Sequence, residues 1–339
     1  MERQYFFGID ISSEFFTVSV YSKENNKNKT YENFDNCECG FELFLNEIQK
    51  VSSKKKNVIL CMEATGVYGE KLAHFLFKTG YDIVIENPLK AKRAFGISKK
   101  KSDAIDSLKI AEYAYRFLDE LQVWTPKHRI IEEIRILLAQ REQLNKQKVS
   151  TSNAKKALER KFVYSIHSIQ IYQELIVLLV EKIKEIEKEI MNLIEEVPDY
   201  KQIFSNVTSI PGVGKILTFH LLVLTNGFTE NLNSKKLASY LGIVPEIYQS
   251  GTSIRKRSSS SGVGPGALRK ILYLVSMTAR VHNKPMKSYF LRKVAEGKSK
   301  KLVLNNIANK MLKIIMAIIK SGNSYSENFK SINPVFLKN

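Results

Sequence analysis

Four acidic residues stand where predicted strands end and where a predicted helix begins, and they limit the folds open to this chain. The four are Asp10, Glu63, Asp103 and Asp106. The first two follow apolar runs, and the other two follow the basic stretch Lys99–Lys101. A carboxylate at the end of a buried strand is costly unless something neutralises it, and neighbouring carboxylates repel one another. Bound divalent metal is the usual remedy, and phosphoryl transfer is the usual chemistry of such a cluster.

The composition indicates a partner of negative charge. The 339 residues suffice for two domains and a linker, and 44% of them are hydrophobic, so cores can form. Lys and Arg total 53 against 34 acidic residues, a formal net charge of +19. A globular protein this basic usually binds a polyanion, with nucleic acid ahead of an anionic membrane surface.

The sequence predicts a cytoplasmic protein. We find no uninterrupted apolar stretch long enough to span a bilayer, and the first residues do not read as a signal peptide. The three cysteines, Cys37, Cys39 and Cys61, lack the spacing of a disulfide framework or a zinc site. We therefore expect reduced thiols and no membrane segment.

The first part of the chain alternates between strand and helix patterns. Strands are predicted over 4–11, 15–22, 29–34, 57–63 and 81–86, and helices over 40–52, 67–78 and 103–118. Three strands followed by alternating helices and strands indicate an α/β domain with a mixed sheet. Its boundary is predicted near Thr125-Pro126.

Residues 128–196 contain no Gly or Pro and are rich in Lys, Glu, Leu and Ile. An apolar seam alternates four and three residues apart, as in a coiled coil, through Leu179, Ile183, Ile186, Ile190 and Leu193. Arg141 stands where an apolar residue would fit. We predict a projecting helical arm, with a plain helical bundle as the alternative.

The last part of the chain is predicted to be mostly α. Helices are predicted over 237–241, 267–281, 285–295 and 302–320, and a Ser/Gly-rich loop over 246–265. Gly212-Val213-Gly214 resembles the hairpin of a helix-hairpin-helix element, whose backbone N–H groups, with Lys215, would hold a phosphate. A tight turn between packed helices is an equal alternative.

The acidic residues could form one metal site. Asp103 and Asp106 are three residues apart and would share one face of a helix. If the strands of Asp10 and Glu63 are adjacent, their carboxylates can point to the same edge of the sheet. Two Mg²⁺ ions about 4 Å apart could then clamp a phosphate. The alternative for Asp103 is a helix cap.

Two other patterns bear on function. The turn Asp10-Ile11-Ser12-Ser13 is similar to that of actin-like sugar kinases, but the second Gly-rich phosphate turn of such kinases is not evident. Basic residues are dense enough to favour nucleic-acid contact over solvated faces. The candidates for that contact are Lys101, Gly212, Gly214, Lys215, Arg255, Lys256, Arg257, Arg269, Lys298, Lys300 and Lys301.

Short motifs in a shared order resemble one family over nearly the whole chain. In the first domain they are Gly8-Ile9-Asp10, Glu63-Ala64-Thr65-Gly66-Val67-Tyr68, Asn87-Pro88 and Lys101-Ser102-Asp103-Ala104-Ile105-Asp106. Later they are Ser209-Ile210-Pro211-Gly212-Val213-Gly214, Leu237-Ala238-Ser239-Tyr240-Leu241-Gly242, Ser250-Gly251 and Leu268-Arg269. The chain thus resembles the transposases of insertion-sequence family one-hundred-and-ten, the bridge-RNA-guided recombinases.

The resemblance implies a domain plan and a set of site residues. The plan is a RuvC-like domain of ribonuclease-H fold over 1–125, a helical coiled-coil arm over 126–200, a C-terminal serine transposase domain over 201–325 and a tail over 326–339. The four acids would hold Mg²⁺, and Ser250 would be the nucleophile. The chain departs from the family's pattern at 258–265, where a basic residue and a Gly-Asn-like turn are usual, so a backbone contact there is not expected.

The resemblance also implies an activity and partners. The expected protein is an RNA-guided recombinase of a bacterial or archaeal mobile element, acting at the nucleoid on target and donor DNA. A guide RNA and a dimer or tetramer of the chain are the expected partners. Two alternatives use the same residues differently: a RuvC-like nuclease or junction resolvase that activates water, and a non-catalytic nucleic-acid-binding protein.

Overall fold

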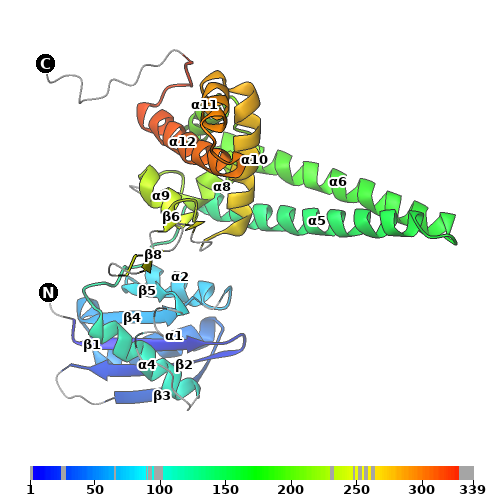
Figure 1. Ribbon diagram of the computed structural model, residues 1–339. Helices are drawn as coiled ribbons and strands as arrows, with labels where there is room; N and C mark the ends of the chain where they lie inside the picture. Colours follow the sequence, from blue (N-terminus) through cyan, green and yellow to red (C-terminus); the bar gives the residue numbers. More distant parts are fainter. Residues whose placement is uncertain are drawn as a thin grey trace, which may run out of the picture. The chain divides into compact units, whose positions relative to one another are not determined.

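The computed structural model describes residues 3–23, 28–64, 66–88, 90, 94, 102–229, 233–246, 249–250, 254–255, 259–260 and 264–327. The chain divides into two compact units, Met1–Pro126 (unit 1) and Lys127–Asn339 (unit 2), and we describe each by itself. Figure 1 shows the helices and strands of both.

Unit 1 is built on a mixed sheet, as the sequence predicts. Its strands are β1 (Tyr5–Ile11), β2 (Phe15–Ser22), β3 (Asn28–Asp35), β4 (Val58–Glu63) and β5 (Ile83–Glu86). They lie in the order β3-β2-β1-β4-β5. The first three are antiparallel neighbours, whereas β4 is parallel to both β1 and β5. The carboxyl ends of β1, β4 and β5 therefore meet at one edge of the sheet.

Helices cover the two faces of this sheet (Figure 1). They are α1 (Glu38–Val51), the short η1 (Lys55–Asn57), α2 (Glu70–Lys78) and α4 (Asp103–Arg116). Phe7 and Ile9 of β1 pack in one cluster with α1 and α2, while Phe6 packs in another with α4. Because side chains alternate along a strand, the even-numbered residues of β1, including Asp10, face α4.

Among its described residues, the regular structure of unit 2 is helical apart from four two-residue strands. Its helices are α5 (Arg129–Glu159), α6 (Ile166–Glu195), α7 (Pro198–Thr208), α8 (Lys215–Leu224), α9 (Ser234–Tyr240), α10 (Gly266–His282), α11 (Lys284–Ala295) and α12 (Lys300–Ser321). The last six share one apolar core. The mixed α/β first part and mostly α remainder predicted from the sequence are thus confirmed.

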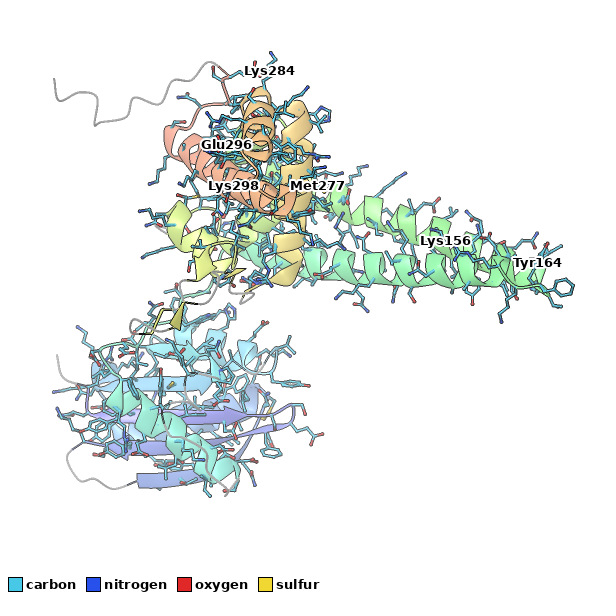
Figure 2. The ribbon with its side chains drawn as sticks, in the orientation of Figure 1. Lys156, Tyr164, Met277, Lys284, Glu296 and Lys298 are labelled. Atoms are coloured by element: carbon cyan, nitrogen blue, oxygen red, sulfur yellow. A yellow bond between two sulfur atoms is a disulfide. The ribbon has the colours of Figure 1, made fainter. Side chains whose placement is uncertain are left out.

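Helices α5 and α6 form a hairpin that projects from the other helices of unit 2 (Figure 1). Four of the five predicted seam residues are buried, namely Ile183, Ile186, Ile190 and Leu193, and the fifth, Leu179, is half-buried. Arg141 fits at its position because its guanidinium pairs with Glu187 of α6 at 2.7 Å. Towards the end of the hairpin, near Lys156 and Tyr164 in Figure 2, most side chains are exposed.

The prediction of a loop over 246–265 is wrong in part. β6 (Pro245–Glu246) pairs with β9 (Ser259–Ser260), and β7 (Gln249–Ser250) pairs with β8 (Ile254–Arg255), both antiparallel. Strands of two residues are too short to show an alternating pattern in the sequence.

One further prediction needs correction. Cys37 and Cys39 are joined in a disulfide, whereas Cys61 is a buried free thiol. Helix α12 is long and apolar enough to cross a membrane by length and composition alone, with a mean hydropathy of 1.5 over an 18-residue window. Half of that window is buried inside the protein, and α12 packs on α10 and α11, which is the behaviour of a core helix.

Candidate metal centre and nucleic-acid interface

Asp10 and Glu63 end neighbouring parallel strands in matching positions. The register of β1 and β4 pairs Ile9 with Met62, so the next residue on each strand is one of these two acids. Met62 packs in the cluster on the α1–α2 face, so Glu63 faces α4, as Asp10 does. The structure thus brings the two predicted strand acids to the same edge and face of the sheet.

A glycine lets α4 lie directly on that face. A Cβ atom on Gly8 would lie 2.1 Å from the carbonyl oxygen of Ser107 and 2.2 Å from the backbone nitrogen of Ala111. The Ser107 hydroxyl also lies 2.9 Å from that of Ser19, the β2 neighbour of Gly8. This contact carries Asp106, the residue before Ser107, towards the end of β1 that bears Asp10.

The first turn of α4 supplies the other two acids. Ser102, not Asp103, caps the helix: its hydroxyl accepts a hydrogen bond from the backbone N–H of Ile105 at 3.3 Å. The alternative that Asp103 is the cap is therefore wrong, and among the described residues its exposed carboxylate has no partner. Asp106 forms an ion pair with Lys109 at 3.4 Å.

A fifth carboxylate at this edge was not predicted as a site residue. Glu86 ends β5 opposite Glu63 in the ladder, and its side chain is only 13% exposed. The Tyr113 hydroxyl of α4 donates to Glu86 at 3.2 Å, which shows that Glu86 also faces α4. Its position at the end of a predicted strand is the same signal that singled out Glu63.

This negative charge contributes to raised pKa values of two neighbouring groups, Cys61 and Tyr113. Burial raises the pKa of the Cys61 thiol to about 12, with Glu86 and Glu63 adding to the effect. Burial likewise raises the pKa of Tyr113 to about 12, again with Glu86 contributing. Both groups stay protonated at neutral pH, so the α4 face presents carboxylates with no competing thiolate or phenolate.

The carboxylates suit a hard cation but are not drawn tightly together. An all-oxygen, anionic donor set is the kind that Mg²⁺ prefers. Within the described ranges, three ligand atoms lie within 4.8 Å of one another at only one place, Asp35, Cys37 and Cys39. Asp10 and Glu63 share an edge and a face of the sheet, and no three of the four predicted acids reach that spacing.

The predicted nucleophile lies in unit 2. Ser250 is the second residue of β7, paired with Ile254 of β8, and Arg255 follows in β8. The predicted contacts Lys101, Lys256 and Arg257 lie outside the described residues.

The turn before α8 contains two glycines with different surroundings: Gly212 packs tightly against α10, whereas there is space around Gly214. Gly212 has a φ of +97°, and a Cβ there would lie 2.8 Å from the Ala279 backbone of α10. Gly214 is the N-cap of α8, and a Cβ there would meet no atom of the described residues within 4 Å. Lys215 forms an ion pair with Glu187 at 2.7 Å, so its ammonium already has an acidic neighbour.

The remaining basic candidates fall into two groups. Arg269 donates to the carbonyl oxygens of Leu241 at 3.3 Å and Gly264 at 3.2 Å, which is a structural use of the guanidinium. Lys298, Lys300 and Lys301 are exposed at the start of α12 and form no ion pair with another described residue, although the pKa of Glu296 is lowered by its hydrogen bond with Lys293 and, to a lesser extent, by the charge of Lys298. Cations at a helix N-terminus oppose the helix dipole, so an anionic partner there is favoured.

Comparison with known proteins identifies the class to which these two units belong. Residues 7–162 match the DEDD transposase domain of IS110 type, and residues 205–291 match the Transposase IS116/IS110/IS902 family. The chain belongs to the IS110 family of transposases and is therefore a DNA transposase or recombinase. A domain of DEDD type indicates dependence on divalent metal in general.

Relatives of known name agree with this family. The pilin gene-inverting proteins of Moraxella lacunata and Moraxella bovis are each 29% identical over 326 residues, covering 95% of this chain and 98% of theirs. An insertion element IS110 protein of Streptomyces coelicolor is 29% identical over 119 residues, which is 35% of this chain and 29% of that protein.

Proposed function

We propose that this chain is an RNA-guided DNA recombinase that cuts and rejoins DNA through a covalent phosphoserine link at Ser250. The observation that carries the proposal is the meeting of Asp10 and Glu63 at one sheet edge, beneath the helix that bears Asp103 and Asp106. The IS110-type transposase match over the same residues supports it.

The fold of unit 1 supports a RuvC-like, ribonuclease-H-like assignment. The sheet has the strand order β3-β2-β1-β4-β5, and β2 runs opposite to the other four strands, which is the arrangement expected of that fold. Acids at the carboxyl ends of the central strands and on a helix over them are where such a nuclease would hold cations. The proposed ligands are Asp10, Glu63, Asp103 and Asp106.

Bound Mg²⁺ would supply neutralisation of the phosphate and a lower pKa for the attacking alcohol. Asp103 is available for this role because Ser102 takes over capping. Asp106 would exchange its ion pair with Lys109 for the cation. Glu86 holds α4 at the edge through Tyr113 and adds negative charge beside Glu63.

The proposed exchange needs no external energy. The Ser250 oxygen forms a bond to phosphorus as the bond from phosphorus to the 3′-oxygen breaks. The serine hydroxyl loses its proton to solvent, and the departing oxygen takes one up as a 3′-hydroxyl. Attack by another strand's 3′-hydroxyl on the phosphoserine reverses these steps and rejoins DNA.

The proposed partners follow from charge and from the family resemblance. A net charge of +19 suits target DNA, donor DNA and a guide RNA whose base pairing selects the sequence. The α5–α6 hairpin would act as a coiled-coil arm that joins subunits of a dimer or tetramer, in the cytoplasm at the nucleoid. Ser250 of one subunit would then work with the acids of another.

The deciding experiment compares variants on labelled DNA with guide RNA and Mg²⁺. The wild type is expected to give a DNA band that stays attached to protein in SDS, and both Ser250→Ala and Asp10→Asn are expected to lose it. If Ser250→Ala still cuts DNA, the chain is a hydrolytic nuclease. If Asp10→Asn leaves every activity unchanged, the acids are not catalytic.

A further inference from the structure

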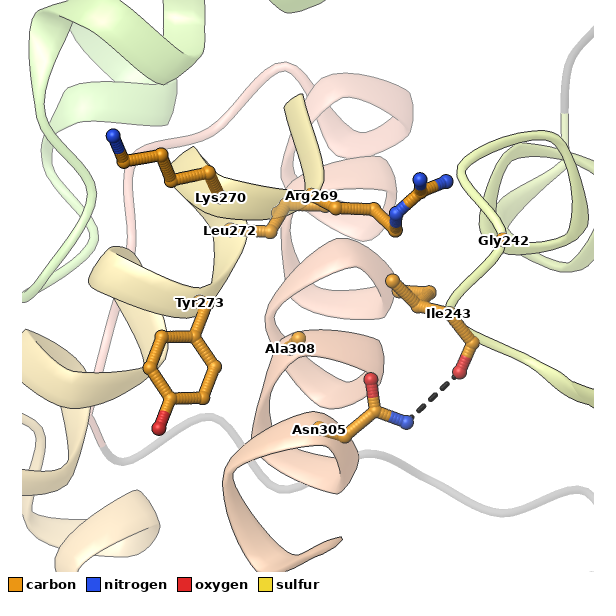
Figure 3. Close-up of a pocket in the computed structure, with 8 residues that line it drawn as sticks. All are labelled: Gly242, Ile243, Arg269, Lys270, Leu272, Tyr273, Asn305 and Ala308. Carbon is orange, nitrogen blue, oxygen red and sulfur yellow. Dashed lines mark hydrogen bonds between the residues drawn. The ribbon is translucent and has the colours of Figure 1, made fainter. Parts of the chain in front are cut away.

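A cavity of about 260 Å³ lies in unit 2 between α10, α12 and the segment that follows α9 (Figure 3). Its lining residues are Gly242, Ile243, Arg269, Lys270, Leu272, Tyr273, Asn305 and Ala308. None of the roles described above uses this cavity. Two of its lining residues, Gly242 and Ile243, come just before β6 in the sequence and a few residues before β7, the strand that contains Ser250.

The walls of the cavity are fixed by contacts within the protein. Asn305 donates from Nδ2 to the carbonyl oxygen of Ile243 at 2.9 Å, and Asn309 donates to the same oxygen at 3.3 Å. The guanidinium of Arg269 is held by its hydrogen bonds to the carbonyl oxygens of Leu241 and Gly264. Leu272 and Ala308 are buried and form the apolar floor. The cavity is therefore formed before any ligand arrives.

Three groups at the cavity remain available to a ligand. Tyr273 is 39% exposed and stands at the rim. The Oδ1 atom of Asn305 accepts no hydrogen bond from the described residues and is turned away from the Ile243 carbonyl (Figure 3). Lys270 is exposed and pairs with no acid within the described ranges, and its chain extends away from Arg269 (Figure 3).

The size of the cavity and the chemistry of these groups limit the class of ligand that it could bind. Pockets for drug-sized ligands measure about 300–1,000 Å³, so this cavity suits a smaller planar group. A lone phosphate would not need the aromatic rim or the apolar floor, and an acyl chain would leave Asn305 and Lys270 unused. Unstacked nucleobases are recognised by aromatic stacking and by hydrogen bonds to their edges, with a cation for the adjoining phosphate.

We propose that this cavity binds one unstacked nucleobase of a single-stranded stretch of nucleic acid. Tyr273 stacks on the base, Asn305 Oδ1 accepts a hydrogen bond from an N–H on its edge, and Lys270 pairs with the neighbouring phosphate. The proposal rests on the action of this family on DNA, and it is independent of the serine chemistry proposed for Ser250.

The test uses the full chain with single-stranded oligonucleotides that carry 2-aminopurine at one position at a time. EDTA is present, so binding is read without cleavage. A change in 2-aminopurine emission is expected at one position on binding, in the wild type and in Tyr273→Phe. Tyr273→Ala is expected to lose that change and to bind about 5- to 150-fold more weakly, the range for a lost stacking contact.

A neighbouring substitution on the same helix, Leu274→Ala, is the matched control for Tyr273→Ala. Leu274→Ala alters the next residue of α10, which is 52% exposed and does not line the cavity, and it is expected to bind as the wild type does. Parallel DNA and RNA series show which strand supplies the base. Equal binding by Tyr273→Ala and Leu274→Ala, or no position-specific emission change in either series, would overturn the proposal. Ser250→Ala is expected to keep the signal, so failure of the serine chemistry is seen separately.

Discussion

Gly8 of β1 lies directly beneath Ser107 of α4, so closely that a Cβ on the glycine would lie 2.1 Å from the serine carbonyl oxygen. The absence of a side chain at one position thus sets how near a whole helix comes to the sheet. Because Asp106 precedes Ser107 and Asp10 lies two residues beyond Gly8, the same contact sets the separation of two proposed metal ligands.

Gly8→Ala is expected to push α4 away from the sheet. Overpacking of this kind typically costs about 1–3 kcal/mol of unfolding free energy. The fluorescence of Trp124, which packs against the core of unit 1 and is the only tryptophan in the sequence, can follow denaturant unfolding of that unit. DNA cleavage is also expected to fall, because the acids on α4 move away from Asp10.

Gly266→Ala is the matched control for this prediction. Gly266 is the first residue of α10, and a Cβ there would meet only Arg269 at 3.7 Å, an ordinary contact. Stability of unit 2 within about 0.5 kcal/mol of the wild type is expected for this variant. It is followed by helical circular dichroism, because Trp124 reports on unit 1. If Gly8→Ala were equally well tolerated, the close contact between α4 and β1 would be incorrect.

Glu86→Gln is expected to weaken divalent metal binding without unfolding unit 1. The substitution keeps the shape of the side chain but removes a negative charge beside Glu63. Changes to groups that support metal ligands typically weaken metal affinity about 10–100-fold. The affinity for Mn²⁺, measured by isothermal titration calorimetry, gives the size of the effect. Asp119→Asn removes an exposed charge from the same unit and serves as control; equal affinities for the two variants would refute a supporting role for Glu86.

Glu187 is expected to make the stability of unit 2 sensitive to acid. Burial alone would raise its pKa, but hydrogen bonds from Lys215 and Arg141 outweigh burial and lower the pKa below its usual value. The resulting stability is fully present above the unfolded-state pKa of about 4.3 and is lost as the pH falls below it.

Glu187→Gln should therefore cost about 1 kcal/mol at pH 7 and flatten the loss of stability below about pH 4.3. Helical circular dichroism during denaturant unfolding at several pH values gives this comparison. Glu185→Gln, whose ion pair with Lys182 is well exposed, should behave as the wild type does. An unchanged acid profile in Glu187→Gln would show that the Arg141–Glu187–Lys215 contacts do not stabilise unit 2.

A mixture of two inactive variants tests whether the proposed site is shared between subunits. Asp10→Asn retains Ser250, and Ser250→Ala retains Asp10, so a mixed oligomer contains one intact site if each site draws on two subunits. Partial recovery of DNA joining is then expected after the variants are mixed and allowed to exchange. No recovery in oligomers shown to be mixed would place both residues of a site in one subunit.

The sequence predicted the parts of the fold that depend on local patterns. Apolar runs and β-branched or aromatic residues predicted β1, β2 and β4, and the acids at the ends of β1 and β4 indicated the sheet edge that carries the candidate site. Glu86 also ends a predicted strand, but only the ladder register that pairs it with Glu63 shows that it lies at the same edge. Ser102 as cap and Glu187 as partner of Lys215 depend on exact geometry or on contacts between residues far apart in sequence, which local patterns do not reveal.

The short strands around Ser250 and the disulfide of Cys37 and Cys39 escaped prediction for a related reason. Two-residue strands have no periodicity, and cysteines separated by one residue are too few to indicate a framework. Lysines and asparagines interrupt the apolar residues of α12, and its buried face makes it a core helix of unit 2.

Mass spectrometry of the protein–DNA adduct tests the central claim most directly. Wild-type protein is incubated with DNA, guide RNA and Mg²⁺, digested with nuclease and protease, and searched for a peptide that carries a nucleotide. The account predicts a nucleotide phosphate on Ser250, absent from Asp10→Asn. A nucleotide on another residue, or DNA cleavage with no nucleotide-bearing peptide, would contradict it.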